Sequence, residues 1–101
     1  MTIQELITKG KGQAGAWRVS EWTAPNEPDW TYHTLWHYST AMMTWRSKGH
    51  LNEIERMSLG RGSASDQNGM NTAFRVIGAP LYFSRAGGAE IRNYETGQVM
   101  A

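Results

Sequence analysis

The sequence predicts a small α+β domain, in which an antiparallel sheet of about four or five strands packs against one main helix. Short runs rich in aromatic residues and threonine, separated by turn residues, are typical of strands. Residues 66–77 instead repeat apolar side chains at helical spacing. A chain of 101 residues can build one core, so we expect a single domain over residues 1–101 with its core at 16–94.

Residues 1–15 predict a short N-terminal helix followed by a flexible linker. Thr2 and Glu5 match a capping box, in which each side chain accepts a hydrogen bond from the backbone of the other residue. Gly10 ends the helical pattern. The segment lacks the apolar core of a signal peptide, and no run reaches the roughly 20 apolar residues of a membrane span. We therefore expect a soluble intracellular protein.

The middle of the chain predicts most of the sheet. Residues 16–22 alternate as a strand does, and the two prolines within 23–29 predict a loop. Residues 30–46 predict a central strand, or two strands with a bulge, covered on both sides for part of its length. A turn then leads to a strand at 53–59. On a single strand, one face of the 30–46 run would carry Trp30, Tyr32, Trp36, Tyr38 and Met42.

The main helix is predicted over residues 66–77, because apolar residues recur at i, i+3, i+4 and i+7 from Met70 to Ile77. Ser65 or Asp66 can cap its start. A glycine inside a helix costs about 1 kcal/mol relative to alanine. Gly69 therefore predicts close contact with another backbone or with a ligand.

The C-terminal part predicts a hairpin and a tail. Residues 81–85 and 89–94 alternate apolar and polar side chains on either side of a Gly-Gly turn, which is typical of paired strands. Residues 95–101 are expected to fray.

Composition excludes several classes of site. The formal net charge is +1 and the pI about 8.1, so no strong overall field favours a nucleic-acid partner. The chain has no cysteine, which removes disulfide scaffolds, thiolate zinc sites and cysteine nucleophiles. His33 and His37 would lie about 13 Å apart on a strand, too far to share a metal ion. We expect no metal and no cofactor.

A Ser-His-Asp set can be assembled from Ser63 or Ser65, His37 and Asp66. The chain has no nucleophile elbow, and a triad is defined by geometry that a sequence does not reveal. The sequence therefore favours a binding protein over an enzyme.

The glycine-rich loop before the helix has two interpretations. Arg61, Ser63 and Ser65, next to a helix N-terminus, resemble a generic anion site. The loop lacks the lysine of a P-loop and the glycine spacing of a dinucleotide site, and Asp66 would repel a phosphate. We favour the second interpretation, in which Ser and Asp side chains cap the helix and Asn68 and Asn71 hydrogen-bond back to the loop.

The aromatic strand also has two interpretations. Its rings, with Arg18, Arg46, Lys48 and Arg56, could stack on the bases of a single-stranded nucleic acid. With few Leu, Ile and Val residues available, however, most of the tryptophans are expected in the core. One or two exposed aromatic residues beside an arginine would be enough for a contact surface.

The pairing of LWHYSTAMMTW with GRGSASDQNGMNTAFRVIGAPLYFSRAGGAEI resembles a family of small uncharacterised proteins encoded by bacteriophages of actinobacteria. In that family an HYST-type strand precedes an SDQNGMN segment, and a G-x-P-x-Y hairpin ends the domain. The match covers roughly residues 30–91. The resemblance implies a phage origin, action in the cytoplasm of an infected bacterium, and a signature composed of Ser65, Asp66, Gln67, Asn68 and Asn71.

Together these features predict a non-enzymatic phage accessory protein that binds a host protein. Its predicted surface joins the loop at 58–71 to the aromatic strand, and comprises Arg61, Ser63, Ser65, Asp66, Gln67, Asn68, Asn71, Trp36 and Tyr38. The alternatives are nucleic-acid binding through Arg46, Arg56 and Arg61, and a structural role in the virion. A homodimer could form by edge pairing at 53–59 or 89–94.

Overall fold

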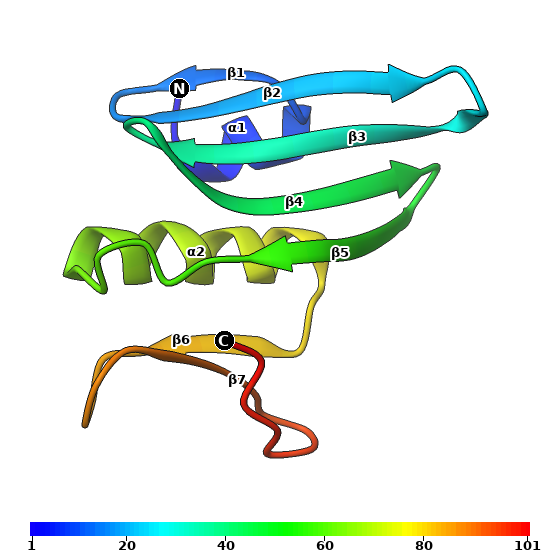
Figure 1. Ribbon diagram of the computed structural model, residues 1–101. Coiled ribbons are helices and arrows are strands. Elements are labelled where there is room, and N and C mark those ends of the chain that lie inside the picture. The colour runs from blue at the N-terminus through cyan, green and yellow to red at the C-terminus, as the bar shows by residue number, and fades with distance from the viewer.

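Five strands in chain order form one antiparallel sheet, and two helices lie on one side of it (Figure 1). The computed structural model describes all residues, 1–101. The sheet consists of β1 (Gly12–Ala14), β2 (Trp17–Ala24), β3 (Glu27–His37), β4 (Thr40–Lys48) and β5 (Leu51–Met57). The remaining elements are α1 (Ile3–Lys9), α2 (Ala64–Ile77) and a separate two-stranded sheet of β6 (Leu81–Ser84) and β7 (Glu90–Asn93). The predicted α+β class is confirmed.

Alternation along the strands gives the sheet a covered face and an open face. Val19, Leu35 and Met43 lie opposite one another on β2, β3 and β4 and are buried. They belong to one cluster of 14 buried apolar side chains, to which both helices and the β6–β7 hairpin contribute. The alternate side chains of the same strands point away from the helices and form the open face.

Each helix is tied to the covered face through a histidine of β3. The predicted capping box of α1 is present, and Gly10 ends the helix in a left-handed conformation. The Gly10 carbonyl accepts a hydrogen bond from His33 Nδ1 at 2.7 Å, and His33 Nε2 lies 2.9 Å from Ser47 Oγ. His37 makes the corresponding link to the start of α2.

The predicted cap of α2, Ser65 or Asp66, is wrong by two or three residues. Ser63 is the N-cap, and its Oγ accepts from the Asp66 N–H at 3.0 Å. The Asp66 carboxylate in turn accepts from the Ser63 N–H at 3.1 Å, which completes a capping box. The reciprocal pair satisfies two backbone amides at once, whereas a cap at Ser65 or Asp66 would start the helix later and lose this arrangement.

Gly69 makes the close contact that its place in a helix predicts, although the neighbour is a side chain and not a backbone or a ligand. A methyl group at this position would lie 2.7 Å from Trp17 Cε2 and closer still to two other ring atoms. The indole of Trp17 therefore lies directly against the backbone of α2. This contact sets how closely α2 approaches β2.

The run at 30–46 is two strands of a tight hairpin. The chain reverses at Tyr38 and Ser39, so that His37 pairs with Thr40. Tyr38 has a φ of +55°, which is uncommon for a residue other than glycine. After the reversal the faces of the run differ from those of a single strand, and Met42 is buried in the core.

The structure also differs from the sequence predictions in four smaller respects. The linker contains the edge strand β1, and the loop predicted at 23–29 shrinks to a turn because Ala24 already pairs with Glu27. The predicted C-terminal hairpin is present, but it forms its own sheet. The tail does not fray: residue Met100 donates its N–H to the Ile91 carbonyl at 2.7 Å.

Replacing Gly69 with alanine is expected to destabilise the protein, despite the higher helix propensity of alanine. Overpacking a filled site costs about 1–3 kcal/mol of unfolding free energy, measured by urea denaturation. Asn68→Ala, one residue away on the exposed side of α2, is the control and should change stability by less than about 0.5 kcal/mol. A Gly69→Ala variant as stable as that control would contradict the close contact between Trp17 and the backbone of α2 at Gly69.

Candidate functional site

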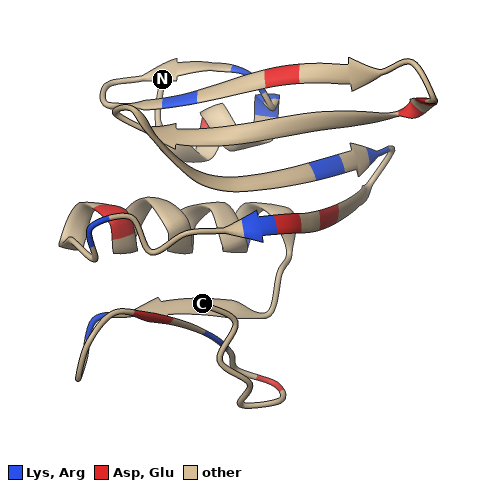
Figure 2. Cartoon of the chain, viewed as in Figure 1, with Lys and Arg blue, Asp and Glu red and all other residues tan.

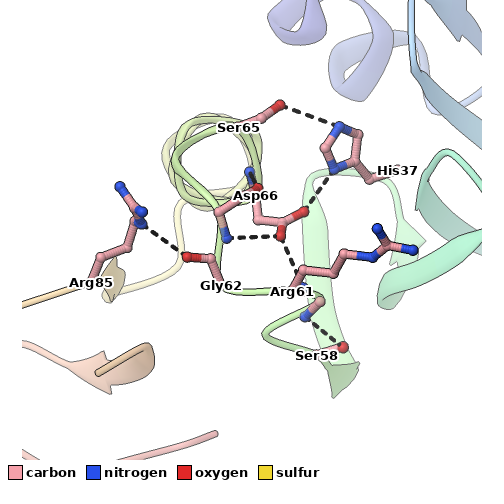
Figure 3. A network of polar contacts seen from close by, with 9 residues as sticks. His37, Ser58, Arg61, Gly62, Ser65, Asp66 and Arg85 are labelled. Carbon is pink, nitrogen blue, oxygen red and sulfur yellow. Dashed lines mark hydrogen bonds and ion pairs between the residues drawn. The ribbon is translucent and has the colours of Figure 1, made fainter.

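The Asp66 carboxylate is the centre of a buried polar cluster at the start of α2 (Figure 3). Asp66 is 3% exposed. One oxygen accepts from His37 Nδ1 at 2.7 Å. The other accepts from the backbone N–H groups of Arg61 at 3.0 Å and Ser63 at 3.1 Å. The carboxylate therefore joins the end of β3, the loop before α2 and the first turn of the helix.

The His37 ring is held on several sides. It stacks on Trp17, with ring centroids 4.1 Å apart and planes 6° from parallel. The Tyr38 ring lies 4.8 Å away at 35°. His37 Nε2 faces Ser65 Oγ at 3.2 Å (Figure 3). Since an ionised carboxylate can only accept, Nδ1 carries a proton, and in the neutral tautomer Nε2 is then free to accept from the serine hydroxyl.

Hydrogen bonds decide the charge state of Asp66. Burial by itself raises the pKa of this carboxyl, but hydrogen bonds from His37, Ser63 and Arg61 outweigh burial and lower the pKa below its ordinary value of 3.8. The group is therefore ionised at neutral pH and can accept the Nδ1 proton of His37.

A hollow of about 340 Å³ lies beside this cluster, between the Tyr38–Thr40 turn and the loop before α2. Tyr38 is 75% exposed at its edge. The Arg61 side chain extends along it, while Arg85 Nε donates to the Gly62 carbonyl at 2.9 Å and holds the loop from the other side (Figure 3). This part of the predicted surface is brought together by the fold.

The remaining residues of the predicted signature have separate positions on α2. The Gln67 amide lies 3.5 Å from the Tyr82 hydroxyl, and Asn68 is exposed. Asn71 is buried and pairs with the backbone of Phe83 in both directions, donating at 3.0 Å and accepting at 2.7 Å. Asn71 thus anchors the β6–β7 hairpin to α2 and is not available to a partner.

The open face of the sheet carries a second group of candidate residues. Trp22 stacks on Tyr32 with ring centroids 4.3 Å apart. Arg46 lies over the Trp30 ring at 4.0 Å, and Arg18 lies over the Trp36 ring at 4.9 Å. All of the side chains that define the open face, except that of Trp30, lie opposite a residue of a neighbouring strand. They are Arg18, Ser20, Trp22, Trp30, Tyr32, Thr34, Trp36, Thr44, Arg46, Lys48, Glu53 and Arg56.

Charges of both signs are interspersed across these strands (Figure 2). Arg46 Nη2 donates to Glu53 at 2.6 Å and its Nη1 donates to Glu27 at 3.1 Å. Glu27 also accepts from the Tyr32 hydroxyl, which fixes that ring beneath Trp22. The charged network thereby holds the aromatic side chains of the open face in place.

The predicted surface is divided between two sides of the molecule. Trp36 lies on the open face, whereas Tyr38 and Arg61 lie at the hollow beside α2. The alternative set is divided in the same way, because Arg46 and Arg56 lie on the open face without Arg61. The reversal at Tyr38 causes this separation, since it sends the chain away from the open face after Trp36.

The predicted surface contains neither Trp30 nor Trp22, and of these two residues of the open face the more exposed is Trp22. It is 48% exposed on the open face. In the alternation of β2, Trp22 lies on the face opposite to the buried Trp17 and Val19. This alternation indicates exposure of Trp22 only once it is known which face the helices cover.

Comparison with protein-family models, with curated proteins and with solved structures finds no match for this chain. The resemblance to a phage family therefore stays a prediction. No group of three or more His, Asp or Glu side chains is arranged to hold a metal ion. Neither helix is long and apolar enough to cross a membrane.

The lowered pKa of Asp66 predicts how stability depends on pH. A carboxyl whose pKa is lower in the folded protein stabilises it above the unfolded pKa, and this contribution is lost as the pH falls through the folded value. Asp66→Asn should cost about 3 kcal/mol of unfolding free energy at pH 7. The difference from wild type should shrink steadily below about pH 4.

Urea denaturation between neutral and acid pH measures this difference. Glu95→Gln is the matched control, because Glu95 is exposed and its carboxylate makes no hydrogen bond in the structure. Its difference from wild type should stay near zero throughout. A cost of Asp66→Asn that stays constant down to the lowest pH would show that folding does not lower the pKa of Asp66.

Proposed function

We propose that this protein is a bacteriophage accessory protein that binds a host protein through the open face of its sheet. The phage origin and the site of action, the cytoplasm of an infected bacterium, are supported by the resemblance in residues 30–91. The choice of surface is supported by one observation. Trp22, Trp30 and Trp36 lie on a sheet face that no helix covers, each against an aromatic or cationic neighbour.

Fixed aromatic rings favour recognition because little conformational entropy remains to be lost on binding. Trp22 is held by its stack on Tyr32, and Tyr32 is held by its hydrogen bond to Glu27. Tryptophan, tyrosine and arginine are the residue types that most often dominate binding energy at protein interfaces. The open face presents all three types next to one another.

The charge pattern favours a protein over a nucleic acid. Arg46, the most central cation, is neutralised by Glu53 and Glu27, and Glu55 lies 3.9 Å from it. A nucleic-acid surface needs cations that remain free to replace counterions on phosphates. We therefore propose a partner surface with apolar side chains at its centre and charges of both signs around them.

Nucleic-acid binding is the second candidate, and one observation favours it. Arg18, Lys48 and Arg56 on the open face form no ion pair with a carboxylate. Cations beside aromatic rings on an uncovered sheet can hold a single strand by stacking and phosphate contacts. Such binding would weaken steeply with salt and with loss of Arg56, whereas recognition of a protein would tolerate both better.

Affinity capture from an actinobacterial lysate, with and without nuclease, tests the proposal. We expect one stoichiometric host protein that survives nuclease. Trp22→Ala should weaken its binding by about 2 kcal/mol, or roughly 30-fold, because the half-exposed indole can anchor the contact. The folded protein should tolerate this substitution, since Trp22 lies outside the core.

Tyr94→Ala is the matched control, because Tyr94 is an exposed aromatic residue at the end of the β6–β7 hairpin. Equal loss of the partner in both variants would contradict the open face as the binding surface. Recovery that collapses with nuclease would favour the second candidate. Capture of the bait alone, with a concentration-dependent dimer in solution, would show that the open face binds a second copy of this chain and not a host protein.

A further inference from the structure

We propose that Ser65 is an activated nucleophile, with His37 as its general base, and that it accepts acyl groups from small activated esters. The proposal concerns the cluster beside α2 and not the open face. A failure of the binding function therefore does not affect this proposal, and a failure of this proposal does not affect the binding function.

The arrangement has the order of contacts that nucleophilic serine chemistry requires. The serine hydroxyl donates to Nε2 of a histidine, whose Nδ1 donates to a buried carboxylate. Here the two distances are 3.2 Å from Ser65 to His37 and 2.7 Å from His37 to Asp66. Such sets are recognised by geometry and not by their order in the chain.

Burial differs among the three groups in the way this chemistry needs. Asp66 and His37 are 3% and 7% exposed, so the acid and the base are shielded from solvent. Ser65 is exposed, so an ester can reach its hydroxyl. The stack on Trp17 keeps the imidazole plane fixed, and two backbone N–H groups keep the carboxylate in place.

The position of Ser65 also supplies donors for a developing oxyanion. Ser63 caps α2, which places Ala64 and Ser65 at the first two helical positions. N–H groups at these positions have no acceptor within the helix, and the helix dipole is positive at this end. Preorganised donors of this kind stabilise the negative charge that forms on a carbonyl oxygen under attack.

The surroundings of Ser65 indicate the class of substrate. The nearby hollow is lined by His37 and Asp66 but not by Ser65, so the hydroxyl faces open solvent and not an enclosed acyl pocket. Without such a pocket, a substrate gains little binding energy to lower the barrier. We therefore infer that the acyl donors are small esters with a good leaving group, such as aryl acetates.

The reaction consumes one ester and one water molecule. Ser65 Oγ attacks the carbonyl carbon while its proton passes to His37 Nε2, and the carbon–oxygen bond to the phenol then breaks. The departing oxygen keeps the bonding electron pair and takes the proton from His37. Water attacks the acylated serine in the same way, giving its proton to the imidazole, which returns it to Ser65 Oγ. The products are a carboxylic acid and a phenol.

Labelling with a fluorophosphonate probe is the first test. We expect one adduct per chain, located at Ser65 by peptide mass spectrometry and absent in Ser65→Ala. Ser39→Ala is the matched control, because Ser39 is an exposed serine in the neighbouring turn and should leave the labelling unchanged. Hydrolysis of 4-nitrophenyl acetate should be similar in the wild type and in Ser39→Ala, and it should be lost in Ser65→Ala.

Single-thiol variants give a second test that does not depend on turnover. Because the chain has no cysteine, Ser65→Cys and Ser39→Cys each carry one thiol. An adjacent base raises the thiolate fraction near neutral pH, so iodoacetamide should alkylate Ser65→Cys about 10-fold faster than Ser39→Cys. Adding His37→Gln to Ser65→Cys should remove the difference.

Two results together would overturn the proposal: equal alkylation rates for the two thiols, and no fluorophosphonate adduct on Ser65. The cluster would then serve only to hold α2 against β3. Both serine substitutions lie at exposed positions, so circular dichroism should show folded proteins in each case.

Discussion

The structure depends on one buried charge. Asp66 is removed from water, and an unpaired carboxylate there would cost several kcal/mol, so folding requires that all of its partners arrive together. Those partners come from β3, from the loop after β5 and from the first turn of α2. Trp17 completes the arrangement, because its indole lies between the His37 ring and the backbone at Gly69. A single polar cluster thus fixes the position of the main helix on the sheet.

The two histidines of β3 show which side chains of this strand face the helices and which face away from them. His33 and His37 share the covered face, where one holds the end of α1 and the other the start of α2. The residues that alternate with them, among them Trp36, must therefore point to the opposite side. The covered side contains the hydroxyl of Ser65 and its base, and the open side contains the aromatic rings. Binding and chemistry are proposed for different sides because the pleat of one strand separates their residues.

Local patterns in the sequence predicted most of the elements, and contacts between distant residues explain what they missed. The period of α2 and the misfit of Gly69 were visible because both depend on neighbours within one helix. The hairpin at Tyr38 was not, since Tyr-Ser lacks the Asn-Gly or Asp-Gly pair that usually marks a two-residue turn. His37 and Asp66 were recognised as residue types, but they are 29 positions apart and only the fold brings them together. Trp22 and Trp36 could not be assigned to the open face before it was known which side the helices cover.

The most direct test of this account is the tautomer of His37, read from nitrogen-15 chemical shifts of the imidazole at neutral pH. The ionised carboxylate of Asp66 accepts from Nδ1, so a neutral His37 ring carries its proton on Nδ1 and leaves Nε2 to accept from Ser65. We predict a protected Nδ1 proton that disappears in Asp66→Ala. A ring with its proton on Nε2, or one that exchanges freely with water, would contradict the cluster on which both the position of α2 and the reactivity of Ser65 depend.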